Sequence, residues 1–129
     1  MNDKVEKDWV TARSLCSLPN VFRELRLQIE EDVKTRNALR PKNSPYEFTV
    51  AEDGDRFTVH LEAGEVRMSV TFSLAEHAIL VRDSQGKDAF DVTLTFNDEG
   101  ECRLNVQDKE RELWQVRRMA LEELLFRSY

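Results

Sequence analysis

The feature that most constrains this sequence is a strict alternation of apolar and polar residues between positions 46 and 106. Alternation with a period of two is typical of a strand that buries one face and exposes the other. It predicts an antiparallel meander of about six strands. The predicted strands are 46–51, 56–63, 65–72, 78–82, 90–96 and 101–106.

The residues between the first three strands predict how these strands pair. A two-residue loop at 53–54 would place Val50 opposite Phe57, and a two-residue loop at 63–64 would likewise place apolar residues opposite one another. A shift of one residue would move every side chain to the other face of the sheet. Both loops place apolar residues opposite apolar residues on one face of the sheet, and this agreement supports the predicted meander.

Further along, a loop that ends with Gly100 in the left-handed conformation predicts that Phe96 pairs with Cys102. The pairing that follows the loop at 83–86 stays open, because neither of the two simplest alignments turns every apolar residue inward.

Helical periodicity flanks the predicted sheet on both sides. Apolar residues recur every three or four positions in three segments, at about 3–18, 20–39 and 109–127. Ser17 and Asn20 are candidate caps for the second helix, and Asp108 is a candidate cap for the third. The whole chain, 1–129, is predicted to be a single α+β domain in which two N-terminal helices and one amphipathic C-terminal helix cover the sheet.

The charge of the chain is acidic and unevenly distributed. The net charge is −6, and residues 43–110 carry six positive and fifteen negative side chains, a balance of −9. This acidity argues against nucleic-acid binding, which needs a basic surface. We interpret it as the solvated outer face of the sheet, with an acidic docking surface for a basic partner as the alternative.

The two cysteines and the N-terminus bear on the compartment. Cys16 and Cys102 fall on predicted inward faces, so we expect two separate buried thiols rather than a disulfide framework. The first eight residues are too charged for the apolar region of a signal peptide, and no apolar run has membrane-spanning length. A cytoplasmic location without membrane contact is predicted.

No catalytic or metal-binding motif is recognisable. His60 and His77 lie far apart without a nearby nucleophile, and the carboxylates at 52–55 and 98–101 occupy predicted turns without the spacing of a calcium loop. The four glycines sit at turns rather than in a phosphate-binding loop. We therefore expect no catalytic residues, no metal, no cofactor and no enzymatic activity.

Four residues are candidates for a binding surface. Arg117 falls within the apolar arc of the last helix, which is predicted to face the core and includes Trp114. It would reach past its neighbours to water, pair with a carboxylate, or point into a cavity and hold an anionic ligand. Met119 and Phe126, seven residues apart, project from the opposite side, and Leu27 lies off the apolar face of its own helix. They are either scattered surface residues or an interaction surface.

Together, these features favour a non-enzymatic protein–protein interaction module of the adaptor, chaperone or inhibitor type. Its partner would be another protein or a second copy of the chain in a homodimer. The alternative is a small-ligand binding module with a cavity between helix and sheet near Arg117.

Overall fold

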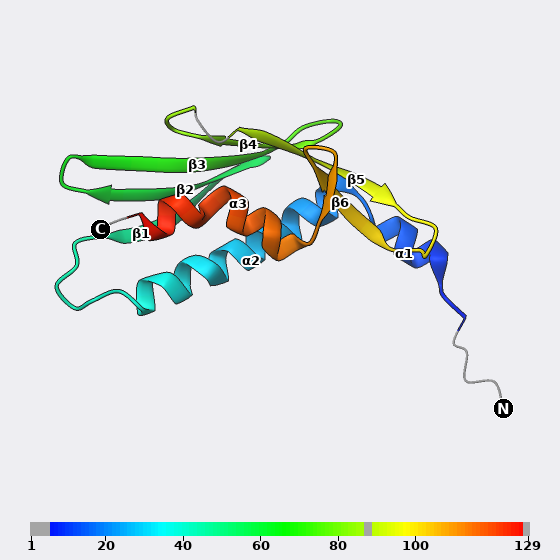
Figure 1. The fold of residues 1–129 in the computed structure, drawn as a ribbon, viewed down its shortest axis with the longest axis horizontal. Coiled ribbons are helices and arrows are strands. Elements are labelled where there is room, and N and C mark those ends of the chain that lie inside the picture. Colours follow the sequence, from blue (N-terminus) through cyan, green and yellow to red (C-terminus); the bar gives the residue numbers. More distant parts are fainter. Residues whose placement is uncertain (1–5, 87–88, 128–129) are drawn as a thin grey trace.

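The computed structural model of the chain describes residues 6–86 and 89–127. It has an α+β fold in which three helices accompany a seven-stranded antiparallel sheet (Figure 1). The helices are α1 (Trp9–Leu15), α2 (Leu18–Ala38) and α3 (Leu113–Phe126). The strands are β1 (Glu47–Asp53), β2 (Arg56–Ala63), β3 (Val66–Leu74), β4 (Ile79–Asp83), β5 (Phe90–Phe96), β6 (Cys102–Val106) and β7 (Lys109–Arg111).

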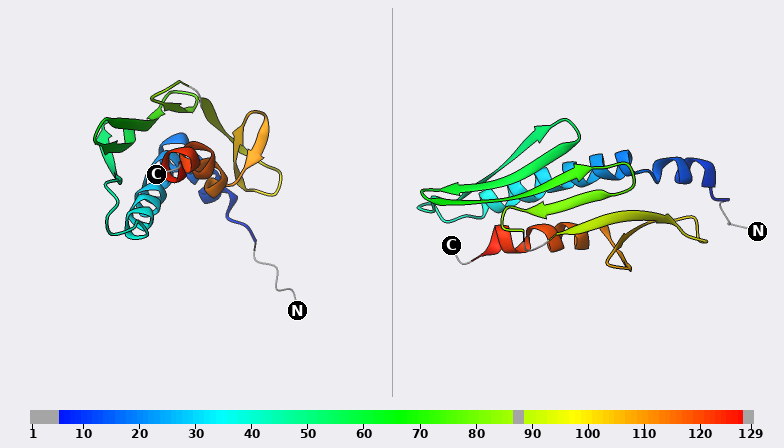
Figure 2. Two further views of the ribbon diagram at one scale, coloured as in Figure 1. Left: turned by 60° about the vertical axis from the view of Figure 1, so that its left-hand side comes forward. Right: turned by 90° about the horizontal axis from the view of Figure 1, so that it is seen from above.

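The sheet is a simple meander, with each strand paired to its neighbours in chain order from β1 to β7. It curves around α2 and α3, which lie against its concave side (Figure 2, left). The core forms where the inward side chains of the strands meet one face of each helix. From α2 this face consists of Phe22, Leu25, Ile29 and Val33, as their spacing predicts. The other side of the helix pair is left uncovered by the sheet.

The first two hairpins have the predicted faces but a different register. Val50 pairs with Val59 rather than with Phe57, and the β2–β3 pairing is shifted by two residues in the same way. The reason is the turn type. Gly54 and Gly64 have φ of +62° and each is the first turn residue rather than the second, as in a type II′ turn. A shift of two residues preserves the faces, so the predicted core survives.

The later hairpins differ in how well they could be predicted. Phe96 pairs with Cys102 as expected, and the pairing that the sequence left open places Ile79 opposite Val92. The strand β7 was not predicted. Gln107 and Asp108 both have positive φ, as in a type I′ turn, and carry the chain into this strand. Asp108 is therefore a turn residue, and its prediction as a helix cap is wrong.

Caps define where the helices begin. The side chain of Asp8 caps α1 by accepting hydrogen bonds from the hydroxyl and the backbone N–H of Thr11, which lower the pKa of Asp8. Ser17 caps α2, as predicted. The first helix is shorter than the expected segment 3–18, of which residues 3–5 lie outside the described part. None of the described helices is long and apolar enough to cross a membrane.

The two cysteines form a disulfide, so the expectation of two separate thiols is wrong. Cys16 follows α1 and Cys102 begins β6, and the bond joins positions 86 residues apart. It fixes the junction between α1 and α2 to the far end of the sheet. The Nζ of Lys7 adds a hydrogen bond to the carbonyl oxygen of Glu99, 2.8 Å away. These links hold α1 in place although the helix itself buries no residue.

The outer edge of β1 is held by α2. The side chain of Asn37 donates to the carbonyl oxygen of Phe48 at 2.8 Å and accepts from the N–H of Phe48 at 2.9 Å. It thereby supplies the two backbone hydrogen bonds that another strand would make at this position. Such coverage blocks the pairing of an edge strand with another chain. The edge of β1 at Phe48 is therefore not the surface on which a partner would add a strand.

Candidate protein-interaction face

A groove runs between α2 and α3 on the side that the sheet leaves uncovered. Its volume is about 390 Å³. The two helices line it with apolar, aromatic and charged side chains, namely Asp32, Thr35, Arg36, Leu39, Trp114, Arg117, Arg118, Leu121, Glu122, Leu125 and Phe126. We refer to this feature as the α2–α3 groove. It combines a concave shape with exposed aromatic side chains.

Arg117 joins the two helices across the groove. Its Nε lies 2.7 Å from Oδ2 of Asp32 and its Nη2 lies 3.3 Å from Oδ1, so the two side chains form a bidentate ion pair. Of the alternatives that the sequence left open, pairing with a carboxylate is the one observed. This ion pair links α2 to α3 across the groove. Because two nitrogens of Arg117 already bind Asp32, its guanidinium has fewer N–H groups left for an external anion.

Arg36 makes a second link between the helices. Its Nε donates a hydrogen bond of 2.8 Å to the carbonyl oxygen of Leu125. Its guanidinium lies over the ring of Phe126, 5.1 Å from the centroid, and 5.7 Å from the centroid of Phe48. Stacking of this kind is favourable for an arginine beside aromatic rings. The exposed ring of Phe126 is thus held at one end of the groove.

Four residues at intervals of four form a continuous stripe on α3: Trp114, Arg118, Glu122 and Phe126. We call this the α3 stripe. Trp114 is 49% exposed and Phe126 is 65% exposed. Between them, Arg118 and Glu122 form an exposed ion pair in which Nε and Oε2 are 3.1 Å apart. The stripe therefore has an aromatic residue at each end and opposite charges in the middle.

The start of α3 fixes the indole of Trp114. The indole Nε1 donates a hydrogen bond of 2.6 Å to Oε2 of Glu112. The N–H of Glu112 in turn donates to Oε1 of Gln115 at 2.7 Å, which caps the helix. A large apolar ring is thus held in one orientation while half of it faces solvent.

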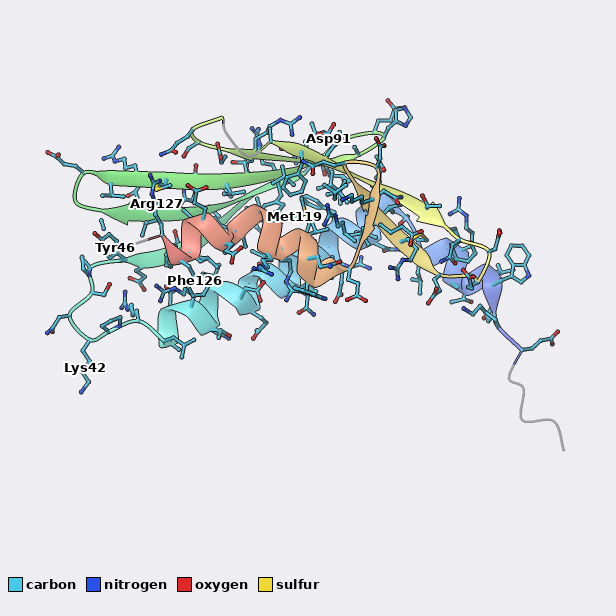
Figure 3. All side chains as sticks on the ribbon, viewed as in Figure 1. Lys42, Tyr46, Asp91, Met119, Phe126 and Arg127 are labelled. Carbon is cyan, nitrogen blue, oxygen red and sulfur yellow. A yellow bond between two sulfur atoms is a disulfide. The ribbon has the colours of Figure 1, made fainter. Side chains whose placement is uncertain are left out.

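Of the three apolar residues predicted to form an interaction surface, Leu27 and Phe126 are exposed, whereas Met119 is not. Met119 is half-buried and packs against the core, so the expectation that it faces outward beside Phe126 is wrong. Figure 3 shows the two residues on α3, with Phe126 near its C-terminal end. Trp114, assigned by the sequence to the buried arc, takes the exposed position instead. Leu27 is exposed but is not among the residues that line the groove.

The other pockets and polar clusters of the described residues are weaker candidates for a functional site. The pocket between α3 and the β3–β4 region has a volume of only about 20 Å³, and Arg117 lines the α2–α3 groove between the two helices rather than this pocket between helix and sheet. Within residues 6–86 and 89–127, no three metal-ligating side chains cluster. The carboxylates at 98–101 surround a turn in which Oδ1 of Asn97 accepts the N–H groups of Glu99 and Glu101.

Comparisons of the chain with protein-family models, with curated proteins and with solved structures gave no match. The fold itself defines the class of this protein: an α+β chain with a curved antiparallel meander and a helix pair on its concave side.

Proposed function

We propose that this protein is a non-enzymatic protein–protein interaction module, of the adaptor, chaperone or inhibitor type, that binds through the α2–α3 groove and the α3 stripe. The observation that carries the proposal is the exposure of Trp114 and Phe126 beside a groove of about 390 Å³. Large aromatic residues left in water are the side chains that contribute most when a partner covers them.

The composition of the groove supports a protein as its partner. Tryptophan, phenylalanine and arginine are enriched at protein interfaces, and the α2–α3 groove carries all three. Its side chains are also held in place before binding, by the pairing of Arg117 with Asp32 and by the contacts of Arg36. A preorganised surface loses less conformational entropy when a partner binds.

The alternative is a module that binds a small anionic ligand in the same groove, whose volume lies within the range of ligand pockets. Arg117 supports this alternative less well than its sequence position suggested, because two of its nitrogens already bind Asp32. The guanidinium of Arg36 is the better candidate for an anion contact. A protein partner is favoured because Trp114 and Phe126 line the groove and are also 49% and 65% exposed, and large aromatic rings left in water are typical of a surface that another protein covers.

The compartment forms part of the proposal. The cytoplasmic location predicted from the sequence assumed free thiols, whereas Cys16 and Cys102 are bonded. Structural disulfides persist in oxidising environments and are rare where thiols are kept reduced. The disulfide therefore favours a protein that works in an oxidising compartment.

Site-specific photo-crosslinking in cells tests the proposed face. A benzophenone amino acid replaces Trp114 or Phe126 in turn, and Asp91 serves as the matched control because it is exposed on β5, on the outer face of the sheet (Figure 3). We expect protein adducts from both groove positions and none from Asp91. We also expect the Trp114 adduct to disappear when Phe126→Lys is added, since the lysine would place a charge where a partner's apolar surface docks.

Two outcomes would overturn the proposal. One is the absence of adducts from both groove positions while the variants remain folded. The other is an adduct from Asp91 as abundant as those from the groove, because that would show contact without a preferred face.

A further inference from the structure

The α3 stripe is complementary to itself. Its order along the helix is Trp114, Arg118, Glu122 and Phe126: an aromatic residue, a cation, an anion and an aromatic residue. Residues four apart lie next to one another on a helix, with a rise of about 6 Å for each step. Reversing the direction of the stripe exchanges the cation with the anion and one aromatic residue with the other.

From this pattern we infer that the partner at the helical face is a second copy of this chain, whose α3 lies antiparallel to the first across a two-fold axis that passes midway between Arg118 and Glu122. This inference rests on the proposed function and names its partner. Arg118 of each copy would then lie opposite Glu122 of the other. Trp114 of each copy would lie opposite Phe126 of the other.

The arrangement agrees with the rules for symmetric dimers. In a two-fold interface the same patch is used twice, so each contact occurs in duplicate. Here two aromatic pairs would flank a central cluster of four alternating charges. Arg118 is 63% exposed and Glu122 is 56% exposed, so both can reach across the axis without any change in the fold.

The α2–α3 groove gives each aromatic side chain a place to pack. Trp114 and Phe126 of one copy lie beside its own groove, and the second copy would bring its aromatic residues to the same region in reverse order. Leu121 and Leu125 provide apolar groove walls behind them. Each sheet would remain on the outside of its own copy, so the two helix pairs would form the inner layers of the dimer.

Charge reversal at the stripe tests the inference, with molar mass measured by light scattering over a dilution series. We expect the wild type to have a mass near twice the 15.1 kDa of one chain. Arg118→Glu alone and Glu122→Arg alone each place like charges opposite one another at both contacts. Each should raise the dissociation constant of the dimer by about tenfold or more. Arg23→Glu, the same charge change at an exposed position of α2, should leave the mass unchanged.

Mixing the two single variants separates pairing from folding. In a mixed dimer the two glutamates of the Arg118→Glu chain face the two arginines of the Glu122→Arg chain, so the mixture should recover the dimer affinity that each variant loses alone. A mixture that stays monomeric, or a wild type that is monomeric throughout the series, overturns the inference. A monomeric wild type whose Trp114 crosslinks to a protein of another mass would overturn self-pairing and leave the proposed interaction module intact.

Discussion

Replacing both cysteines with alanine is expected to lower the free energy of unfolding by about 4 to 5 kcal/mol. The disulfide joins Cys16 to Cys102 across a separation of 86 residues, and a cross-link over so long a segment removes much of the entropy of the unfolded chain. Because small domains are stable by only about 5 to 15 kcal/mol, this loss amounts to about a third of the stability or more. Urea unfolding of the wild type and the double variant measures the difference.

Reductant provides the matched control for this prediction. It should lower the unfolding midpoint of the wild type and leave that of the Cys16→Ala/Cys102→Ala variant unchanged. Thiol titration of the denatured, non-reduced wild type should detect no free cysteine. A wild type with two titratable thiols and a midpoint insensitive to reductant would show that the bond does not form, and the argument for an oxidising compartment would fail with it.

The second large effect is expected at Phe57. This ring is fully buried, stacked on Phe72 with centroids 4.7 Å apart, and 5.2 Å from the centroid of Phe22 on α2. Phe57→Ala should therefore cost about 3 to 5 kcal/mol of unfolding free energy, since it removes a large apolar group and leaves a cavity where α2 meets the sheet.

Thr58 is the control for Phe57, because it is the next residue on the same strand and points to the opposite face. Its hydroxyl lies 3.0 Å from that of Thr71. Thr58→Ala should cost no more than about 1.5 kcal/mol, the value of a typical hydrogen bond. Equal losses from the two variants would show that the core does not lie on the Phe57 face.

The sheet and its inward face could be predicted because alternation is a local signal. The strands from β1 to β6 carry it except for β4, which begins with the three apolar residues Ile79, Leu80 and Val81. The signal survives the two-residue shift at Gly54 and Gly64, because only an odd shift exchanges the faces. The strand β7 could not be predicted in this way. It is three residues long, and no glycine marks the turn at 107–108 that leads into it.

The candidate site was harder to predict because its parts are distant in sequence. Asp32 and Arg117 are 85 residues apart, so nothing local identifies the carboxylate that pairs with this arginine. The disulfide could not be predicted for the same reason, because Cys16 and Cys102 are 86 residues apart. Trp114 and Met119 were assigned to the wrong sides because hydrophobicity alone favours burial of the tryptophan. A signal was nevertheless present, since Trp114, Arg118, Glu122 and Phe126 share a spacing of four.

Oxidative footprinting of the tryptophans measures whether a protein covers the helical face in cells. The chain has two tryptophans: Trp114 on the α3 stripe, 49% exposed, and Trp9 on α1, 61% exposed. Labelling is measured by mass spectrometry in intact cells that make the protein and in the unfolded purified chain. Protection of Trp114 well beyond that of Trp9 in cells is the predicted result. Labelling of both in proportion to their exposed fractions would contradict the claim.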